Sequence, residues 1–283
     1  MLARPIAAEL SRLWAQPVTV VNHPGAGSTA APAFVAGAAA DGYTLLVNTS
    51  AHAYSASLVS DLPYDPLADF VPVAPLTSQA YVLVTAKRTG IATLSELISA
   101  SRRWPGQLRF ASAGIGTGTH ICAQAMNIEA GIVAVHVPAS ATDSIVDTIA
   151  RTVAGSADYA IFPIPPAAPF FENGQLVALA VTTAGRSALL PDTPSIAEAG
   201  LPGFDFPIWY GVWAPSATPP SVIHKLARDI SLALAAPSVR SWLAEHGAVP
   251  LNLEQREFAR FVSDESNRAA AIVAKAETHH AAT

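Results

Sequence analysis

RFASAGIGTGTH (residues 109–120) is the stretch from which the fold of this chain can be worked out. Leu108 and Phe110 predict a short strand that ends in serine, glycine and threonine, and a helix is expected from about Thr119 to Asn127. Gly131 stands beyond the expected end of that helix. A strand that turns into a helix is the repeating unit of α/β folds.

The same segment has the composition of an anion-binding loop. Gly114, Gly116 and Gly118 permit backbone angles that other residues avoid, so successive amides can point at one ligand. The helix that follows adds roughly half a positive charge at its N-terminus. Ser112 and Thr117 add hydroxyl groups without charge, and no Lys follows the last glycine as it would in a P-loop. The alternative interpretation is a glycine-rich turn that only packs closely.

Composition narrows the class of protein. Of the 283 residues, 51% are hydrophobic and 13% are charged, which is enough apolar material for two domains or one large one. The net charge is -5 and the 16 Lys and Arg residues are scattered, so no nucleic-acid partner is expected. The single Cys122 excludes an internal disulfide and a cysteine-based metal site, and we interpret it as a buried apolar residue.

Strands and helices alternate along the chain. Apolar runs indicate strands over residues 45–47, 71–76, 80–86, 132–138, 157–162, 176–182 and 209–216. Capping residues at Thr93, Ser195 and Ser221 predict helix starts, and a proline cluster occupies residues 163–169. This alternation predicts mainly parallel sheets with helices on both faces, and a first domain that ends near Trp104. The polar residues that follow the 45–47 strand lie where ligands collect in such sheets.

With these segments in order, the chain resembles the substrate-binding proteins of tripartite tricarboxylate transporters, the Bug-type family. The matching segments are VTVVNHPGAGS (18–28), DGYTLLVNTS (41–50), LPYDPLADFVPVA (62–74), ASAGIGTGTH (111–120), VHVP (135–138), LVALAVTTAGRSALLPDTPSIAEAGLPGF (176–204) and WYGVWAPSATP (209–219). Each segment alone is a weak signal, but their order and spacing are specific.

The resemblance implies the two-lobed α/β fold of type II periplasmic binding proteins, each lobe a mainly parallel sheet flanked by helices. It implies a first lobe of residues 1–105 plus 215–283, a second lobe of residues 106–214, and a ligand cleft between them. The ligand-binding residues expected from the resemblance together with the glycine loop are Thr49, Ser50, Ala51, Ser112, Ala113, Gly116, Thr117, His120, Ala139 and Phe162. No catalytic residue, metal or cofactor is expected.

The function that the resemblance implies is a periplasmic, monomeric receptor for a small organic carboxylate, which it delivers to membrane permease subunits. Two alternatives remain open: an α/β enzyme that acts on a small organic acid, and a truncated relic that binds nothing. The relic is considered because Met1 leads directly into an amphipathic helix, with no secretory signal and without the family's first strand and Pro-Gly-Gly loop. We therefore expect an N-terminally truncated form.

Two further departures concern the ligand. The family's Tyr-Lys-Gly is replaced by Ala139-Ser140-Ala141, which removes an aromatic wall and a cation that would suit a tricarboxylate. Pro163 stands where family members often have an acidic residue, which disfavours an amino-acid ligand.

Other chemistry in the sequence has simpler interpretations. His120 is expected to line the cleft; the alternatives are a buried structural histidine and a catalytic base, although no G-x-S-x-G elbow occurs. Asp65 and its acidic neighbours lack the glycine and distal glutamate of a calcium loop, so we interpret them as solvated loop charges. Trp209 and Tyr210 either pack in a core or flank the ligand.

Overall fold

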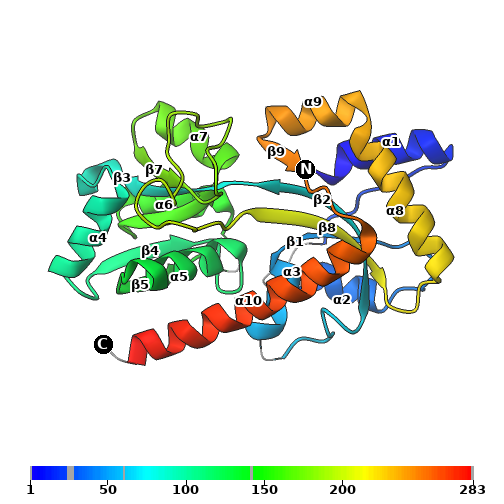
Figure 1. Cartoon of the computed structure of the whole chain (residues 1–283), viewed down its shortest axis with the longest axis horizontal. Coiled ribbons are helices and arrows are strands. Elements are labelled where there is room, and N and C mark those ends of the chain that lie inside the picture. The colour runs from blue at the N-terminus through cyan, green and yellow to red at the C-terminus, as the bar shows by residue number, and fades with distance from the viewer. Residues whose placement is uncertain (1, 24–28, 60, 141–142, 282–283) are drawn as a thin grey trace. The chain divides into compact units, whose positions relative to one another are not determined.

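The computed structural model describes residues 2–23, 29–59, 61–140 and 143–281 (Figure 1). Two compact units divide the chain. The first contains the described residues up to Ser78 together with Trp209–Asn267, and the second contains Gln79–Ile208 together with the described residues from Arg268 onwards. The division differs from the expected one near residues 105 and 214. Residues 79–105 group with the second unit because their strand β3 (Tyr81–Ala86) belongs to that unit's sheet.

The first unit is built on a four-stranded sheet with the order β1-β8-β2-β9. Its strands are β1 (Leu46–Thr49), β8 (Ile208–Pro215), β2 (Phe70–Gln79) and β9 (Ala248–Pro250). The helices are α1 (Ala3–Trp14), α2 (Ala30–Ala36), α3 (Ala51–Tyr54), α8 (Pro220–Ala235), α9 (Pro237–Glu245) and the first part of α10 (Gln255–Ala281). β1 pairs antiparallel with β8, with Thr49 opposite Tyr210.

Helix α1 is anchored in the first unit by its apolar face. Ile6 and Leu10 belong to one buried cluster with residues of β2, β8, α8 and α9, as the helical periodicity of the sequence predicts. Trp14 Nε1 donates to Asp229 Oδ2 of α8 at 2.7 Å. Burial acts to raise the pKa of Asp229, but hydrogen bonds from Lys225, Trp14 and Arg228 lower it overall, so this carboxylate is held ionised.

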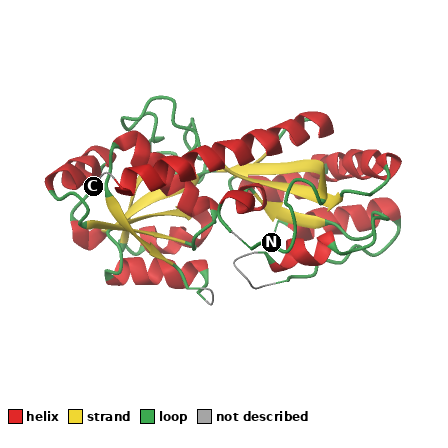
Figure 2. Cartoon of the chain, turned by 90° about the horizontal axis from the view of Figure 1, so that it is seen from below, coloured by secondary structure: helices red, strands yellow, loops and turns green. Residues whose placement is uncertain are grey.

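The second unit is built on a five-stranded sheet with the order β5-β4-β6-β3-β7. Its strands are β4 (Leu108–Ser112), β5 (Ala134–Pro138), β6 (Tyr159–Pro163), β7 (Leu176–Val181) and β3. The helices are α4 (Leu94–Arg103), α5 (Gly118–Ala130), α6 (Ile145–Ala154), α7 (Ile164–Glu172) and the last part of α10. Figure 2 shows the strands of this unit with helices on both sides.

The second sheet is mainly parallel, as predicted, because β4, β5, β6 and β7 share one direction and β3 opposes them. β4 pairs parallel with β5 and with β6, as strands joined through helices must. β3, in contrast, runs antiparallel to both β6 and β7, and β1 runs antiparallel to β8. The chain enters the second sheet through β3 directly from β2 of the first unit, without a crossover helix, so the alternation rule does not fix the direction of β3.

Two of the three expected helix starts are wrong. Thr93 caps α4 as predicted, since its side chain accepts a hydrogen bond from the Glu96 amide. Ser195 and Glu198 form the reciprocal hydrogen bonds of a capping box, but only turns follow them. Ser221 caps nothing, because α8 begins one residue earlier at a proline, a residue whose missing N–H costs nothing in the first turn.

Candidate functional site

The glycine loop lies between β4 and α5, where the sequence predicts it. β4 ends at Ser112, and Thr117 takes the N-cap position of α5 by accepting a hydrogen bond from the His120 amide. Gly114 has a φ of 120° and Gly116 a φ of 88°. Residues with a Cβ rarely adopt these angles, so glycine at both positions gives the loop its shape.

Side-chain hydroxyls hold this loop from within. Thr117 Oγ1 donates to the Gly114 carbonyl at 2.8 Å. The Ala113 amide donates to Thr119 Oγ1 at 3.0 Å, and the two threonine hydroxyls lie 2.9 Å apart. These hydroxyls therefore support the loop. Because the Thr117 hydroxyl gives its one proton to the Gly114 carbonyl, contact between Thr117 and a ligand stays a prediction.

Several amides of the loop have no hydrogen-bond acceptor in the part of the chain that the structure describes. Among the described residues, no hydrogen bond is formed by the N–H groups of Ile115, Gly116, Gly118 and Thr119. Gly118 and Thr119 are buried at the N-terminus of a 13-residue helix that has no acidic residue in its first turn. Buried amides without acceptors at the positive end of a helix are suited to an anion.

The other predicted residues of the second unit differ in accessibility. The Ala139 amide donates to the Ser112 carbonyl at 3.2 Å, so the end of β5 lies beside the glycine loop. Ser112 itself is fully buried, and the exposed fraction of His120 is 9%. Phe162 is fully buried in an apolar cluster with Val82 and its neighbours, where its ring packs in the core.

Sequence reasoning missed His136 of β5. Its Nε2 lies 2.7 Å from Ser112 Oγ, and its ring stacks on His120 with centroids 4.4 Å apart and on Phe110 at 4.7 Å. The parallel register brings His136 and Phe110 together, because these two residues are partners in the β4–β5 ladder. The two residues are 26 positions apart in the chain, so no local motif marks the contact.

The predicted residues of the first unit lie at the end of β1. Thr49 Oγ1 accepts a hydrogen bond from the Ala51 amide at 3.2 Å, and the Ser50 amide donates to the Trp209 carbonyl at 2.9 Å. Ser50 Oγ is fully buried and has no hydrogen-bond partner in the described part of the chain. The polar residues thus lie at the strand end as the sequence predicts, and α3, which the sequence analysis does not predict, follows them directly.

His52 follows in α3 and is enclosed by aromatic rings. Its ring centroid lies 4.7 Å from that of Phe70, 4.9 Å from Trp213 and 6.1 Å from Tyr64. The residue is 1% exposed, and neither ring nitrogen has a hydrogen-bond partner among the residues described. Burial lowers the pKa of His52 to about 4, so the imidazole is neutral at physiological pH.

Trp209 packs in the core of the first unit. Core packing is one of the two roles that the sequence predicts for Trp209 and Tyr210, and contact with the ligand is the other. The Trp209 ring lies against Trp213, Phe258 and Phe261, and its Nε1 donates to Glu265 Oε2 at 3.0 Å. Tyr54 donates its hydroxyl to the same carboxylate oxygen at 2.7 Å. Glu265 therefore joins α10 to two elements of this unit.

The acidic loop after residue 60 stabilises its own turn. Asp65 Oδ1 accepts hydrogen bonds from the Leu67 and Ala68 amides, and these bonds lower the pKa of Asp65. Asp69 Oδ2 accepts from the Asp65 amide at 2.7 Å. Within residues 2–23, 29–59, 61–140 and 143–281, no group of three or more His, Cys, Asp or Glu residues is placed to hold a metal ion. No helix in these ranges is long and apolar enough to cross a membrane.

Comparison with known proteins identifies the family. The family model described as the tripartite tricarboxylate transporter family receptor matches residues 2–278. The chain belongs to this receptor family. Protein BugT of Bordetella pertussis, a relative of this receptor, is 33% identical over 276 residues, which cover 96% of the chain and 83% of BugT. The resemblance drawn from the sequence is confirmed.

Solved structures agree with the family assignment. Rpa4515 of R. palustris with adipate has a TM-score of 0.87 and 30% identity, and the match covers 98% of this receptor and 92% of Rpa4515. MatC of Rhodopseudomonas palustris with bound malate has a TM-score of 0.83 and 34% identity, with 96% and 93% covered. The expected α/β fold of periplasmic binding proteins is thereby confirmed.

Proposed function

We propose that this receptor captures a small organic carboxylate in the periplasm and delivers it to the membrane permease subunits of a tripartite transporter. The observation that carries the proposal is the glycine loop. It presents four amides that have no acceptor among the described residues, two of them buried at the N-terminus of α5. An ionised carboxylate accepts two or more hydrogen bonds and gains from the helix dipole, so it matches this arrangement.

The neutral character of the loop fits a transport role. Residues 112–120 contain no Lys, Arg, Asp or Glu, so the ligand is held by amides and hydroxyls rather than by an ion pair. Hydrogen bonds to a charged ligand contribute about 1.5–3 kcal/mol each, which allows tight binding and later release. A carrier needs both properties.

The ligand class follows from the family together with the loop. The structure of Rpa4515 is one with adipate and that of MatC has bound malate, and both acids are small dicarboxylates. We propose that one carboxylate of such an acid binds the amides near Gly116. Ala113 and His120 of the loop, and Thr49, Ser50 and Ala51 of the first unit, remain proposed ligand contacts, as do Ala139 and Phe162. We also propose that the receptor is a monomer and that it needs no cofactor.

Isothermal titration calorimetry tests the proposal against a panel of mono-, di- and tricarboxylates. We expect saturable binding of at least one dicarboxylate, and an unchanged ligand when it is recovered by chromatography. At 100 times the dissociation constant, binding adds about 2.7 kcal/mol to the free energy of unfolding. Conversion of the acid to a product would favour the enzyme alternative, and the absence of binding across the panel would refute the receptor.

Two alanine variants separate the loop from general backbone effects. Gly114→Ala and Gly90→Ala both place a Cβ at positive φ, with angles of 120° and 69°. Neither Cβ would meet an atom closer than 3.9 Å, so each acts through backbone strain of about 1 kcal/mol or more. We expect Gly114→Ala to weaken carboxylate binding at least tenfold and Gly90→Ala to leave it unchanged. Equal affinities in the two variants would exclude the glycine loop from the binding site.

A further inference from the structure

The environment of Ser112 sets which way its hydroxyl proton points. Its Oγ lies 2.7 Å from His136 Nε2, 3.2 Å from the Gly114 amide, which donates to it, and 3.3 Å from the Gly114 carbonyl. A hydroxyl has one proton and two acceptor positions. The proton can therefore be given to His136 or directed into the glycine loop, but not both.

When the neutral ring carries its hydrogen on Nδ1, His136 makes that choice through its own protonation. A neutral imidazole whose Nε2 carries no hydrogen accepts the Ser112 proton, and the hydroxyl then has nothing to donate to a ligand. In the imidazolium form both ring nitrogens are donors, so Nε2 donates to Ser112 Oγ. The hydroxyl proton is then released towards the Gly114 carbonyl or an anion bound in the loop. Imidazole ordinarily titrates near pH 6.5, within the physiological range.

The elements next to β5 and the segments between them carry the following titratable and charged groups. From α5, His120 stacks on the ring, and Glu129 is exposed near the other end of that helix. Arg109 of β4 alternates to the opposite face of the sheet, where it donates to the Gly155 carbonyl and pairs with Asp158 of the segment before β6.

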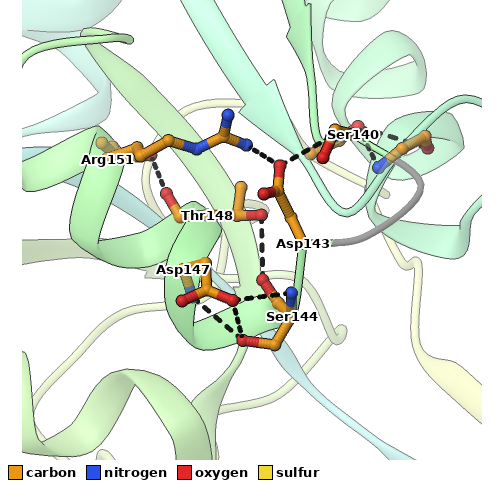
Figure 3. A network of polar contacts seen from close by, with 9 residues as sticks. Ser140, Asp143, Ser144, Asp147, Thr148 and Arg151 are labelled. Carbon is orange, nitrogen blue, oxygen red and sulfur yellow. Dashed lines mark hydrogen bonds and ion pairs between the residues drawn. The ribbon is translucent and has the colours of Figure 1, made fainter.

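The charged groups that follow β5 are joined to one another. Arg151 of α6 pairs with Asp143, and the Asp143 carboxylate also accepts from the Ser140 amide at 2.7 Å (Figure 3). The Asp147 carboxylate accepts a hydrogen bond from the Ser144 amide in the capping box of α6. The titratable ring that stacks on His136 is a second imidazole, that of His120, and stacked imidazoles disfavour simultaneous protonation of both.

We propose that His136 is a positioning residue for carboxylate binding, which in its protonated form turns the Ser112 hydroxyl into a donor to the ligand. This inference rests on the proposed receptor function and deepens it. It predicts that affinity rises as the pH falls from about 8 to about 6, a range well above the pKa of about 4 that is typical of carboxyl groups. One added hydrogen bond to a charged group corresponds to an increase of roughly tenfold or more.

Calorimetric titrations with adipate and with malate at about pH 6 and about pH 8 test this inference. We expect the wild type to bind one of these acids about tenfold more tightly at the lower pH. Ser112→Ala and His136→Gln should each bind the acid equally tightly at the two pH values. The first variant removes the hydroxyl, and the second removes the titrating imidazole. His120→Gln should keep the ratio between the two affinities, whatever it does to the affinity itself.

Each outcome decides between the explanations. A wild-type affinity that is equal at both pH values, or a ratio that survives His136→Gln, would overturn the inference while leaving the receptor function intact. Loss of the ratio in His120→Gln alone would assign the effect to His120 and also overturn it. If neither acid nor any other carboxylate of the panel binds at either pH, the proposed function itself fails, and the inference with it.

A measurement on the wild type alone guards against a variant that does not fold. Titrations at about pH 7 in two buffers of different ionisation enthalpy report the number of protons bound with the ligand. Protonation of His136 on binding predicts a net uptake of a fraction of a proton. Zero uptake, or proton release, would overturn the inference.

Discussion

Acidification should destabilise the first unit through His52. The imidazole is buried among aromatic rings and has no hydrogen-bond partner in the described structure, so its charged form is disfavoured in the folded state. Its pKa falls from 6.5 to about 4 on folding. The unfolded chain therefore binds more protons than the folded chain between these pH values, and stability must fall as the pH decreases through this range.

The magnitude follows from the two pKa values. At roughly 1.4 kcal/mol for each pH unit between them, complete protonation costs about 3 kcal/mol. About 2 kcal/mol of this is lost by about pH 5, and the full stabilisation is present above about pH 7. These losses are a substantial part of the ~5–15 kcal/mol by which folded proteins are normally stable.

Urea unfolding followed by tryptophan fluorescence measures the effect, because Trp213 is in contact with the His52 ring. His52→Phe is the matched control, since it keeps an aromatic ring in the cluster and removes both unsatisfied nitrogens. We expect the wild type to lose about 2 kcal/mol more than this variant between about pH 7 and about pH 5. Equal losses in the two proteins would refute the assignment of the acid sensitivity to His52.

Three further predictions concern stability. Gly211→Ala should destabilise the first unit by about 1–3 kcal/mol in chemical unfolding, because the new Cβ would lie 2.4 Å from Cζ of the buried Phe258 ring; an unchanged midpoint would show that the ring moves freely. Asn127→Leu should lower the free energy of unfolding by about 1–3 kcal/mol, since the buried Tyr159 hydroxyl loses the acceptor that it contacts at 2.7 Å. Adding Tyr159→Phe to this variant should recover most of the lost free energy. Thr117→Val should lower the free energy of unfolding by about 1 kcal/mol through loss of the α5 cap, with Thr117→Ser as the conservative control; equal stabilities of Val and Ser variants would contradict the cap.

Local sequence signals predicted the glycine loop and its helix well. Gly131 takes the left-handed C-cap position expected of the glycine beyond the helix, but α5 ends at Ala130 and not near Asn127. The start lies at Gly118 rather than near Thr119, because Thr117 supplies the cap. Strand, turn and cap are all determined by neighbouring residues, so a single sequence is enough to place them.

The proline cluster after β6 shows where local rules mislead. The prolines of residues 163–169 give no helix signal in the sequence, yet α7 runs from Ile164 to Glu172. Two of the prolines occupy the first turn, where no amide donor is required. Pro169 lies inside the helix, and burial of Ile164 and Ala167 in the core of the second unit stabilises the segment. Tertiary packing decided the outcome against helix propensity.

The contacts of the His136 and His52 rings could not be predicted from local spacing. His136 meets Ser112 only through the register of a parallel strand pair, and His52 meets Trp213 only through the folded first unit. The direction of β3 was equally inaccessible, since its partners β6 and β7 follow about 75 residues or more later in the chain. Long-range pairing sets these contacts, and the sequence carries no local signal for them.

The most direct test of carboxylate binding by the glycine loop is a nuclear magnetic resonance titration of the chain labelled with ¹⁵N only at its 17 glycines. Gly116 and Gly118 carry amides without a protein acceptor among the described residues, and their resonances can be assigned from single alanine variants. A dicarboxylate such as malate should move these two amide protons downfield as they acquire an acceptor, while the exposed Gly90 remains unchanged. If both resonances stay in place at saturation with a bound acid, the central claim is contradicted, and the carboxylate binds elsewhere.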